Sequence, residues 1–267
     1  MDSNLFIICT LTFVIHLVGT LAYAVRIAGV RTRRIAISFA MFNILVLVSR
    51  TSNAFQGPYL AKRIEHNLAT GVMNGELADF RWLLFAATLA TIIGGLLIPS
   101  FQRMFSKAVM HFQTHRSMPR LLMHGFFKGG LSQLKDVASI PAATNLTQMG
   151  RGSGISTSVI ALNVIATALW TVGVLAALYA GYLNPELRVT SSTLSPVING
   201  VATIMLFVII DPQMSVMTDD VVEGKTSEPQ FRRAVVWLVC SRLAGTLLAQ
   251  VILVPSAMLV ALAAEHL

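Results

Sequence analysis

Six long apolar stretches, separated by polar loops, constrain this sequence more than any other feature. A helix needs about 20 apolar residues to cross the hydrocarbon core of a bilayer. Because a backbone N–H or C=O group left unpaired in lipid is costly, segments that span the membrane in this way must be helical. The sequence therefore predicts an all-α integral membrane protein with a single polytopic membrane domain over residues 1–267. The six predicted transmembrane helices cover residues of about 5–25, 35–54, 80–100, 154–183, 196–217 and 234–264.

The lysines and arginines between these stretches are divided unevenly between the two sides. Most of the 20 lie in three loops that must share one side of the membrane, and the longest of these loops is the segment 101–153. Basic loops are retained in the cytoplasm. We therefore expect the segment 101–153 to be cytoplasmic and both termini to lie outside.

The cytoplasmic segment 101–153 begins with an amphipathic pattern. Its apolar residues recur at helical spacing, while Arg103 and Lys107 fall largely on the other side of the helix. We expect this stretch either to prolong the third transmembrane helix or to lie flat at the inner headgroups. The apolar positions are Phe101, Met104, Phe105, Ala108, Val109 and Phe112.

Composition excludes several classes of protein. A chain with 55% hydrophobic and 12% charged residues is not a soluble domain. The net charge of +8 suits contact with anionic membrane lipids and needs no nucleic acid to explain it. The sequence has no Gly-rich phosphate loop with its lysine, no HExxH motif and no Gly-x-Ser-x-Gly elbow. We therefore expect no cofactor, no metal site and no ATP-driven transport by this chain alone.

Two arginine-bearing stretches carry a resemblance to a known family. Residues 24–34 read AVRIAGVRTRR, and residues 48–63 read VSRTSNAFQGPYLAKR. Together with the six-helix layout and the basic inner loop, they resemble the Amj family of lipid II flippases, the alternates to MurJ. The resemblance implies a protein of the bacterial cytoplasmic membrane that moves an undecaprenyl-pyrophosphate-linked disaccharide-pentapeptide to the outer leaflet for cell-wall synthesis.

Lipid II carries a pyrophosphate and peptide carboxylates, so cationic side chains are its expected ligands. Arginine suits them because its guanidinium stays charged and can grip phosphate in a bidentate way. Arg50 and Asn53 fall in the outer part of the second predicted helix, where polar side chains are expensive unless they face a cavity. The candidate substrate-binding residues are Arg26, Arg31, Arg33, Arg34, Arg50, Asn53, Lys62 and Arg63.

A plainer interpretation of these cations stays open. The group from Arg26 to Arg34 could consist of ordinary topology determinants that face anionic headgroups. Arg50 could snorkel to the outer interface from a short helix.

Asp211 and Arg242 form a second candidate constellation. Both lie in predicted helices that are entered from the cytoplasmic side, and both are expected at similar depth. An isolated charge in the membrane is costly, so we predict an intramembrane pair between them. This pair would either be structural or take part in transport. Pro212 predicts a helix irregularity beside the aspartate.

Other functions and contacts stay open from the sequence. Asp211, Arg242 and His16 could form the coupling site of an ion-coupled small-solute transporter, and Glu65 with His66 is a thin candidate site for a membrane-embedded enzyme acting on a polyprenyl phosphate. Small residues recur every four positions at Gly173, Ala177 and Gly181, a face that lets another helix approach closely. We favour packing within one chain for this face over a homodimer contact.

The predicted topology can be tested by cysteine labelling after Cys9 and Cys240 are replaced by serine. In Arg116→Cys the new thiol should be protected from an impermeant reagent in intact cells, because it would be cytoplasmic. In Asn184→Cys the thiol should react with the same reagent. Labelling of both variants from outside would overturn the orientation.

Overall fold

The structure is a computed structural model that describes residues 2–71, 76–115, 139 and 154–267. Its described residues form helices and no strands, and six helical segments are long and apolar enough to cross a membrane. The predicted all-α class is thereby confirmed, and the chain is a multi-pass membrane protein. Five of the segments are α1 (Ser3–Thr32), α2 (Ile35–Thr70), α3 (Glu76–His115), α7 (Thr157–Leu183) and α11 (Glu228–Glu265). Most of the expected cytoplasmic segment lies outside the described residues, but its first part prolongs α3 to His115.

The first two helices are longer than the sequence predicts. α1 runs to Thr32, so Arg26 and Arg31 are helical rather than part of a loop. Only Arg33 and Arg34 join α1 to α2, and Arg33 adopts the left-handed conformation that ends α1. α2 continues through Pro58, whose missing N–H breaks one bond of the ladder without ending a helix that packs on α1.

The remaining span, Pro185–Val222, is built from short pieces. They are η2 (Pro185–Leu187), α8 (Arg188–Thr193), α9 (Ser195–Ile204), the π-helical turn η3 (Met205–Ile210) and α10 (Asp211–Val222). Pro212 has no N–H to donate to the preceding turn, and a widened π turn ends directly before Asp211. The irregularity predicted beside Asp211 is therefore confirmed.

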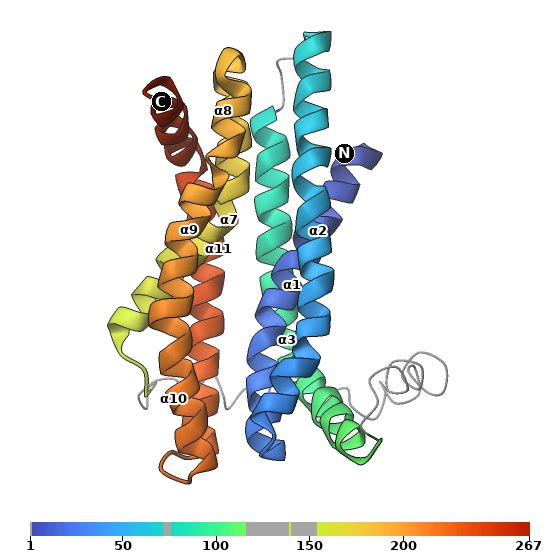
Figure 1. Ribbon diagram of the computed structural model, residues 1–267, viewed down its shortest axis with the longest axis vertical. Coiled ribbons are helices and arrows are strands. Elements are labelled where there is room, and N and C mark those ends of the chain that lie inside the picture. The colour runs from blue at the N-terminus through green and yellow to red at the C-terminus, as the bar shows by residue number, and fades with distance from the viewer. Residues whose placement is uncertain (1, 72–75, 116–138, 140–153) are drawn as a thin grey trace.

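The helices form two groups of three spans (Figure 1). In the first group α1 packs along α2 and α3, and in the second α7 packs along α11 and the broken span. Contact between the groups is made mainly by α3 with α11, and less extensively by α1 with α10 and α2 with α7. Both termini lie toward the upper end in Figure 1, whereas the α1–α2 and α10–α11 junctions lie at the lower end.

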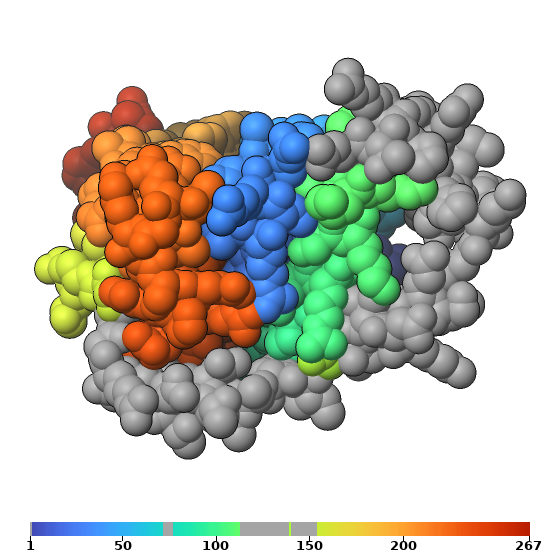
Figure 2. Space-filling model, turned by 90° about the horizontal axis from the view of Figure 1, so that it is seen from below, coloured from blue at the N-terminus to red at the C-terminus, as the bar shows by residue number. Residues whose placement is uncertain are grey.

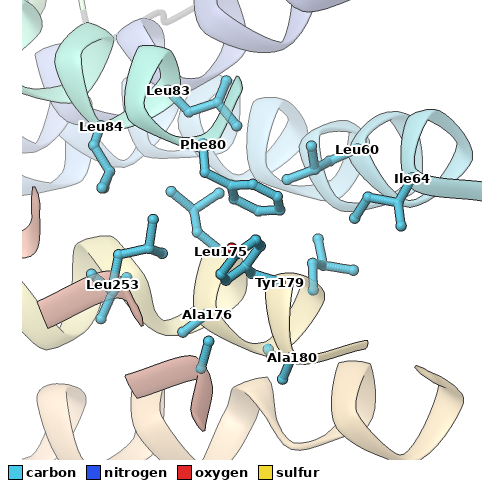
Figure 3. Close-up of a cluster of buried hydrophobic side chains, with 14 of the residues drawn as sticks. Leu60, Ile64, Phe80, Leu83, Leu84, Leu175, Ala176, Tyr179, Ala180 and Leu253 are labelled. Carbon is cyan, nitrogen blue, oxygen red and sulfur yellow. The ribbon is translucent and has the colours of Figure 1, made fainter. Parts of the chain in front are cut away.

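Two buried apolar clusters join the groups at different heights. The Phe80 cluster, at the upper end, includes Leu60 of α2, Phe80 of α3, Tyr179 of α7 and Leu253 of α11. Figure 3 shows the rings of Phe80 and Tyr179 facing each other, with centroids 5.1 Å apart in an edge-to-face arrangement. The Phe231 cluster, at the lower end, contains Ala24, Ile27, Val30, Ile98, Met214, Phe231, Val235 and Leu238.

The small-residue face of α7 is used within the chain. A side chain at Gly173 would collide with Asn199 of α9, and one at Gly181 would meet Arg188 of α8. The broken span therefore covers this face, which confirms the interpretation as intramolecular packing.

Gly245 of α11 shows how closely the second group is packed. A Cβ atom at this position would lie 2.7 Å from the Val164 carbonyl oxygen of α7. Gly245→Ala should therefore push α7 and α11 apart and lower the free energy of unfolding by about 1–3 kcal/mol. The thermal unfolding midpoint in detergent measures this effect.

Gly200→Ala is the matched control, because nothing lies within 4 Å of a Cβ atom at that helical glycine. Alanine also favours the helix more than glycine does. The control should keep or raise the midpoint, and equal midpoints for the two variants would refute the tight α7–α11 contact.

Candidate functional site

A polar face of α1 is directed at the second helix group. His16, Gly19, Tyr23 and Arg26 follow one another at steps of three and four residues, so they lie on one side of the helix. The residues of this face that carry a charge or a ring nitrogen are well buried, with His16 4% and Arg26 8% exposed. Because the surroundings are apolar, a polar group on this face is costly to bury unless it has a hydrogen-bond or ionic partner.

At the lower end Arg26 connects the two helix groups. Its Nη2 atom lies 2.9 Å from Oδ1 of Asp211 on α10, and its Nη1 atom donates to Ser215 Oγ at 3.4 Å. The guanidinium also lies over the Phe39 ring of α2, 5.1 Å from its centroid. α1, α2 and α10 are therefore tied together at one cation.

A second ion pair reinforces the lower end. Arg31 of α1 lies 2.9 Å from Oε1 of Glu228 at the start of α11, and Arg232 shares the same carboxylate. Figure 2 views the molecule from this end and shows the α1–α2 junction between the α10–α11 turn and α3. The two helix groups are thus closed against each other here by charge as well as by the Phe231 cluster.

The predicted direct pair between Asp211 and Arg242 is wrong. Asp211 pairs with Arg26, whereas the Arg242 guanidinium lies against Gly19. Gly19 and Arg26 are seven residues apart on α1, which corresponds to about 10 Å along the helix axis. The positions of Asp211 and Arg242 along their helices indicate similar depth, but they do not reveal that α1 supplies a cation nearer to the aspartate.

Arg242 and its neighbours occupy the middle of the interface. The Tyr23 hydroxyl lies beside Arg242 and Asn163, and His16 is close to Arg242. Asn163 of α7 donates to Ser241 Oγ at 2.7 Å and to the Leu238 carbonyl at 3.2 Å. This set, which we call the central polar cluster, consists of His16, Tyr23, Asn163 and Arg242.

Arg63 organises the upper end of the first group. Its Nε atom contacts Asp79 of α3 at 2.5 Å, and its Nη1 atom contacts Asp2 at 2.6 Å. The hydrogen bond from Arg63, followed by one from the Leu5 N–H, lowers the pKa of the Asp2 carboxyl. The Asp2 carboxylate is therefore ionised near neutral pH, and Arg63 holds the start of α1 against α2 and α3 through its contacts with Asp2 and Asp79.

A looser contact crosses between the groups at this end. Arg188 of α8 lies 3.8 Å from Glu65 of α2. Beside them is a cavity of about 80 Å³, lined by Ile64 and Leu178 among others. Arg81 of α3 donates to Gln250 of α11 at 3.2 Å, and Gln250 returns a bond to the Arg81 carbonyl.

The other predicted substrate-binding residues are exposed and are not brought together. Arg33 and Arg34 lie at the lower end, Arg50 and Asn53 half-way along α2, and Lys62 toward the upper end. Among the described residues, no carboxylate lies within 4 Å of these four cations. Arg26, Arg31 and Arg63 differ from them because each already has an acidic partner.

Sequence reasoning overlooked Tyr23, Gly19 and Asn163. A signal for the first two was available, since His16, Gly19, Tyr23 and Arg26 keep one helical face through an apolar span. Asn163 is the amide side chain in the fourth apolar stretch, 154–183, and a buried polar group there needs a hydrogen-bond partner. Neither signal says which helix lies opposite.

The chain has clear relatives. A family model described as Amj, alternate to MurJ, matches residues 11–264. The chain is 38% identical over 259 residues to a protein of Bacillus subtilis (strain 168) named lipid II flippase Amj, and the match covers 96% of this chain and 95% of that protein. No solved structure matches significantly. The resemblance carried by residues 24–34 and 48–63 is confirmed.

The Arg26–Asp211 pair can be tested by a double-mutant cycle. Asp211→Asn and Arg26→Gln should each lower the thermal unfolding midpoint, and the double variant should lose less than the sum of the two. The expected coupling is about 0.5–3 kcal/mol, toward the lower part of that range because the Asp211 side chain is 43% exposed.

Asp219→Asn is the control for this cycle, because Asp219 is an exposed aspartate on the same helix. It should leave the midpoint unchanged. Strict additivity of the Arg26 and Asp211 single effects would show that the contact contributes nothing to joining the helix groups.

Proposed function

The chain belongs to the Amj family, and on that premise we propose that it is a lipid II flippase. The observation that carries the proposal is the identity of 38% with the protein named lipid II flippase Amj, which extends over 96% of this chain. The similarity therefore includes all six spans rather than one motif. The protein is a transporter and not an enzyme, and its substrate is an anionic headgroup on a polyprenyl chain.

The lower end is proposed to face the cytoplasm. Arg33, Arg34 and Lys225 are exposed there, and basic side chains at membrane boundaries are retained on the cytoplasmic side. Contact with anionic lipids of the inner leaflet follows from the same charges. Because the described residues contain six spans, an even number, both termini would then lie outside.

Entry of the headgroup is proposed to begin at Arg33 and Arg34. They lie at the leaflet where lipid II is made, and neither has an acidic partner among the described residues. A guanidinium without a partner can bind pyrophosphate in a bidentate way. The neighbouring Arg26–Asp211 pair would open to let the headgroup pass between the helix groups, since it is the contact that joins them there.

The remaining candidate residues would contact the headgroup one after another as it moves along α2. Arg50 follows Arg34 by 16 residues and Lys62 follows Arg50 by 12, or about 24 Å and 18 Å along a helix. Asn53 lies one turn beyond Arg50 and adds a hydrogen-bonding side chain. Arg50 lies well inside α2, about 23 Å from its start, and this position favours a role toward the headgroup over snorkelling from a helix end.

The polyprenyl tail would stay in lipid while the headgroup moves. With the cell interior negative, each negative charge moved outward gains about 2.3 kcal/mol per 100 mV, so the step needs no nucleotide. Arg63 would keep a supporting role at the exit, since Asp2 and Asp79 occupy its guanidinium. One chain supplies both helix groups, and a homodimer would contain two such paths.

The proposed function is tested in cells depleted of every other lipid II flippase. Expression of this protein should restore labelling of lipid II in the outer leaflet. Arg50→Ala should abolish that labelling at unchanged membrane abundance, and Arg50→Lys should recover part of it, because an ammonium cannot make bidentate contact.

Arg103→Ala is the control, because Arg103 is an exposed arginine on α3 and takes no part in the proposed path. It should label like the wild type. Absence of labelling with the wild-type protein would refute the function, and full labelling with Arg50→Ala would show that this arginine only snorkels.

A further inference from the structure

Arg242 is placed deep in the membrane-spanning part of α11. It follows Glu228 by 14 residues, which is about 21 Å along the helix. Its guanidinium fills the space that a side chain at position 19 would need, since a Cβ atom there would lie 2.5 Å from Nη2. The half-buried guanidinium of Arg242 on α11 thus lies directly against a glycine of α1.

Within the described part of the chain, no acidic residue balances the positive charge of Arg242. Of the described residues, no aspartate or glutamate forms an ion pair with it, whereas Arg26, Arg31, Arg63 and Arg188 each have one. An unpaired charge at this depth is costly, and helices retain it where a ligand or a water-filled path supplies the counter-charge.

Hydrogen-bonding atoms around Arg242 are also unused. Arg242 Nε, His16 Nδ1 and Asn163 Oδ1 are buried and find no hydrogen-bond partner among the residues that the structure describes. His16 is 4% exposed and Asn163 is fully buried. A buried polar group without a partner loses its hydration without compensation. These atoms therefore indicate a ligand that supplies the missing hydrogen bonds.

The central polar cluster lies between the Phe80 cluster and the Phe231 cluster, and this position indicates what kind of ligand could bind there. On α1, Leu5 and Ile8 belong to the Phe80 cluster, and Ala24 and Ile27 belong to the Phe231 cluster. His16, Gly19 and Tyr23 fall in the interval between them. Access from either end therefore requires one apolar cluster to part, as expected for a half-way position on a path across the membrane.

We propose that the central polar cluster is a binding subsite for the diphosphate group of the lipid-linked substrate, at the mid-point of its movement. This proposal rests on the proposed function. Arg242 neutralises one phosphate through its Nε–H and Nη groups, and His16 and the Tyr23 hydroxyl donate to the remaining oxygens. Low polarity around the subsite strengthens these contacts.

The experiment measures binding to the purified full-length protein in lipid nanodiscs. The probes are undecaprenyl pyrophosphate, undecaprenol as the lipid without charge, and inorganic pyrophosphate as the diphosphate without lipid. Arg242→Gln should weaken binding of undecaprenyl pyrophosphate at least tenfold and leave binding of undecaprenol unchanged. Competition by inorganic pyrophosphate in the wild type shows that the diphosphate alone is recognised, and absence of competition shows that recognition needs the lipid-linked form.

Two further variants complete the test. Arg103→Gln removes an exposed arginine on α3 and should bind like the wild type. Gly19→Ala keeps the charge but displaces the Arg242 guanidinium from its position against α1. This variant should also bind undecaprenyl pyrophosphate more weakly and undecaprenol unchanged, even if Arg242→Gln does not fold. If folded Arg242→Gln binds undecaprenyl pyrophosphate with wild-type affinity, the proposal is overturned. If only Gly19→Ala folds, wild-type affinity in that variant overturns it.

The outcomes separate this subsite from the flippase function. If the wild type binds undecaprenyl pyrophosphate through Arg242 but does not restore outer-leaflet lipid II in depleted cells, the function fails and the subsite stands. If the wild type restores lipid II and Arg242→Gln binds normally, the subsite fails and the function stands.

Discussion

A charged side chain inside an apolar bilayer needs a partner, and this requirement shapes the surface on which the two helix groups meet. α1 carries the polar face, with His16, Gly19, Tyr23 and Arg26 directed at the second group. Arg26 is satisfied by Asp211, and the contact joins the groups at one end. Two turns deeper, Arg242 lies on Gly19 without an acidic partner among the described residues. The same face of α1 therefore carries Arg26, which joins the helix groups, and contacts Arg242 of α11, which we propose meets a ligand.

Apolar packing divides this surface into three levels. The Phe80 cluster and the Phe231 cluster each contain residues from both helix groups, and the central polar cluster lies between them. Within each group, glycines allow closer contact, as where Gly94 meets Thr20 and Gly245 meets Thr167. Packing inside a group is thus more extensive than packing between groups. Relative movement of the groups is expected to cost less than disruption of either one, which suits the proposed passage of the headgroup between them.

The exposed cations at the start of α2 and along it, and the half-buried Arg242 of α11, would serve different steps of the proposed path. Arg33, Arg34 and Arg50 can meet a headgroup without rearrangement, because no carboxylate of the described residues holds them. Arg26, Arg31 and Arg63 must first release an acidic partner. Arg242 lies at the interface of the helix groups, and in the proposed path the headgroup would meet it as the groups part. Charge on the substrate would therefore be met first at the surface and then within the interface.

The six spans, the basic end, the family and the irregularity at Pro212 could all be predicted from the amino-acid sequence, because apolar length, charge asymmetry and a missing N–H act locally along the chain. It underestimated α1 and α2, since a helix that packs on neighbours continues past the residues needed to cross the lipid. The candidate cations were identified, but their partners were not. The pairing of Asp211 with Arg26 and the contact of Arg242 with Gly19 became visible in the packing of the helices. Depth can be counted along a helix, whereas pairing depends on which helices are neighbours and on how each is rotated about its axis.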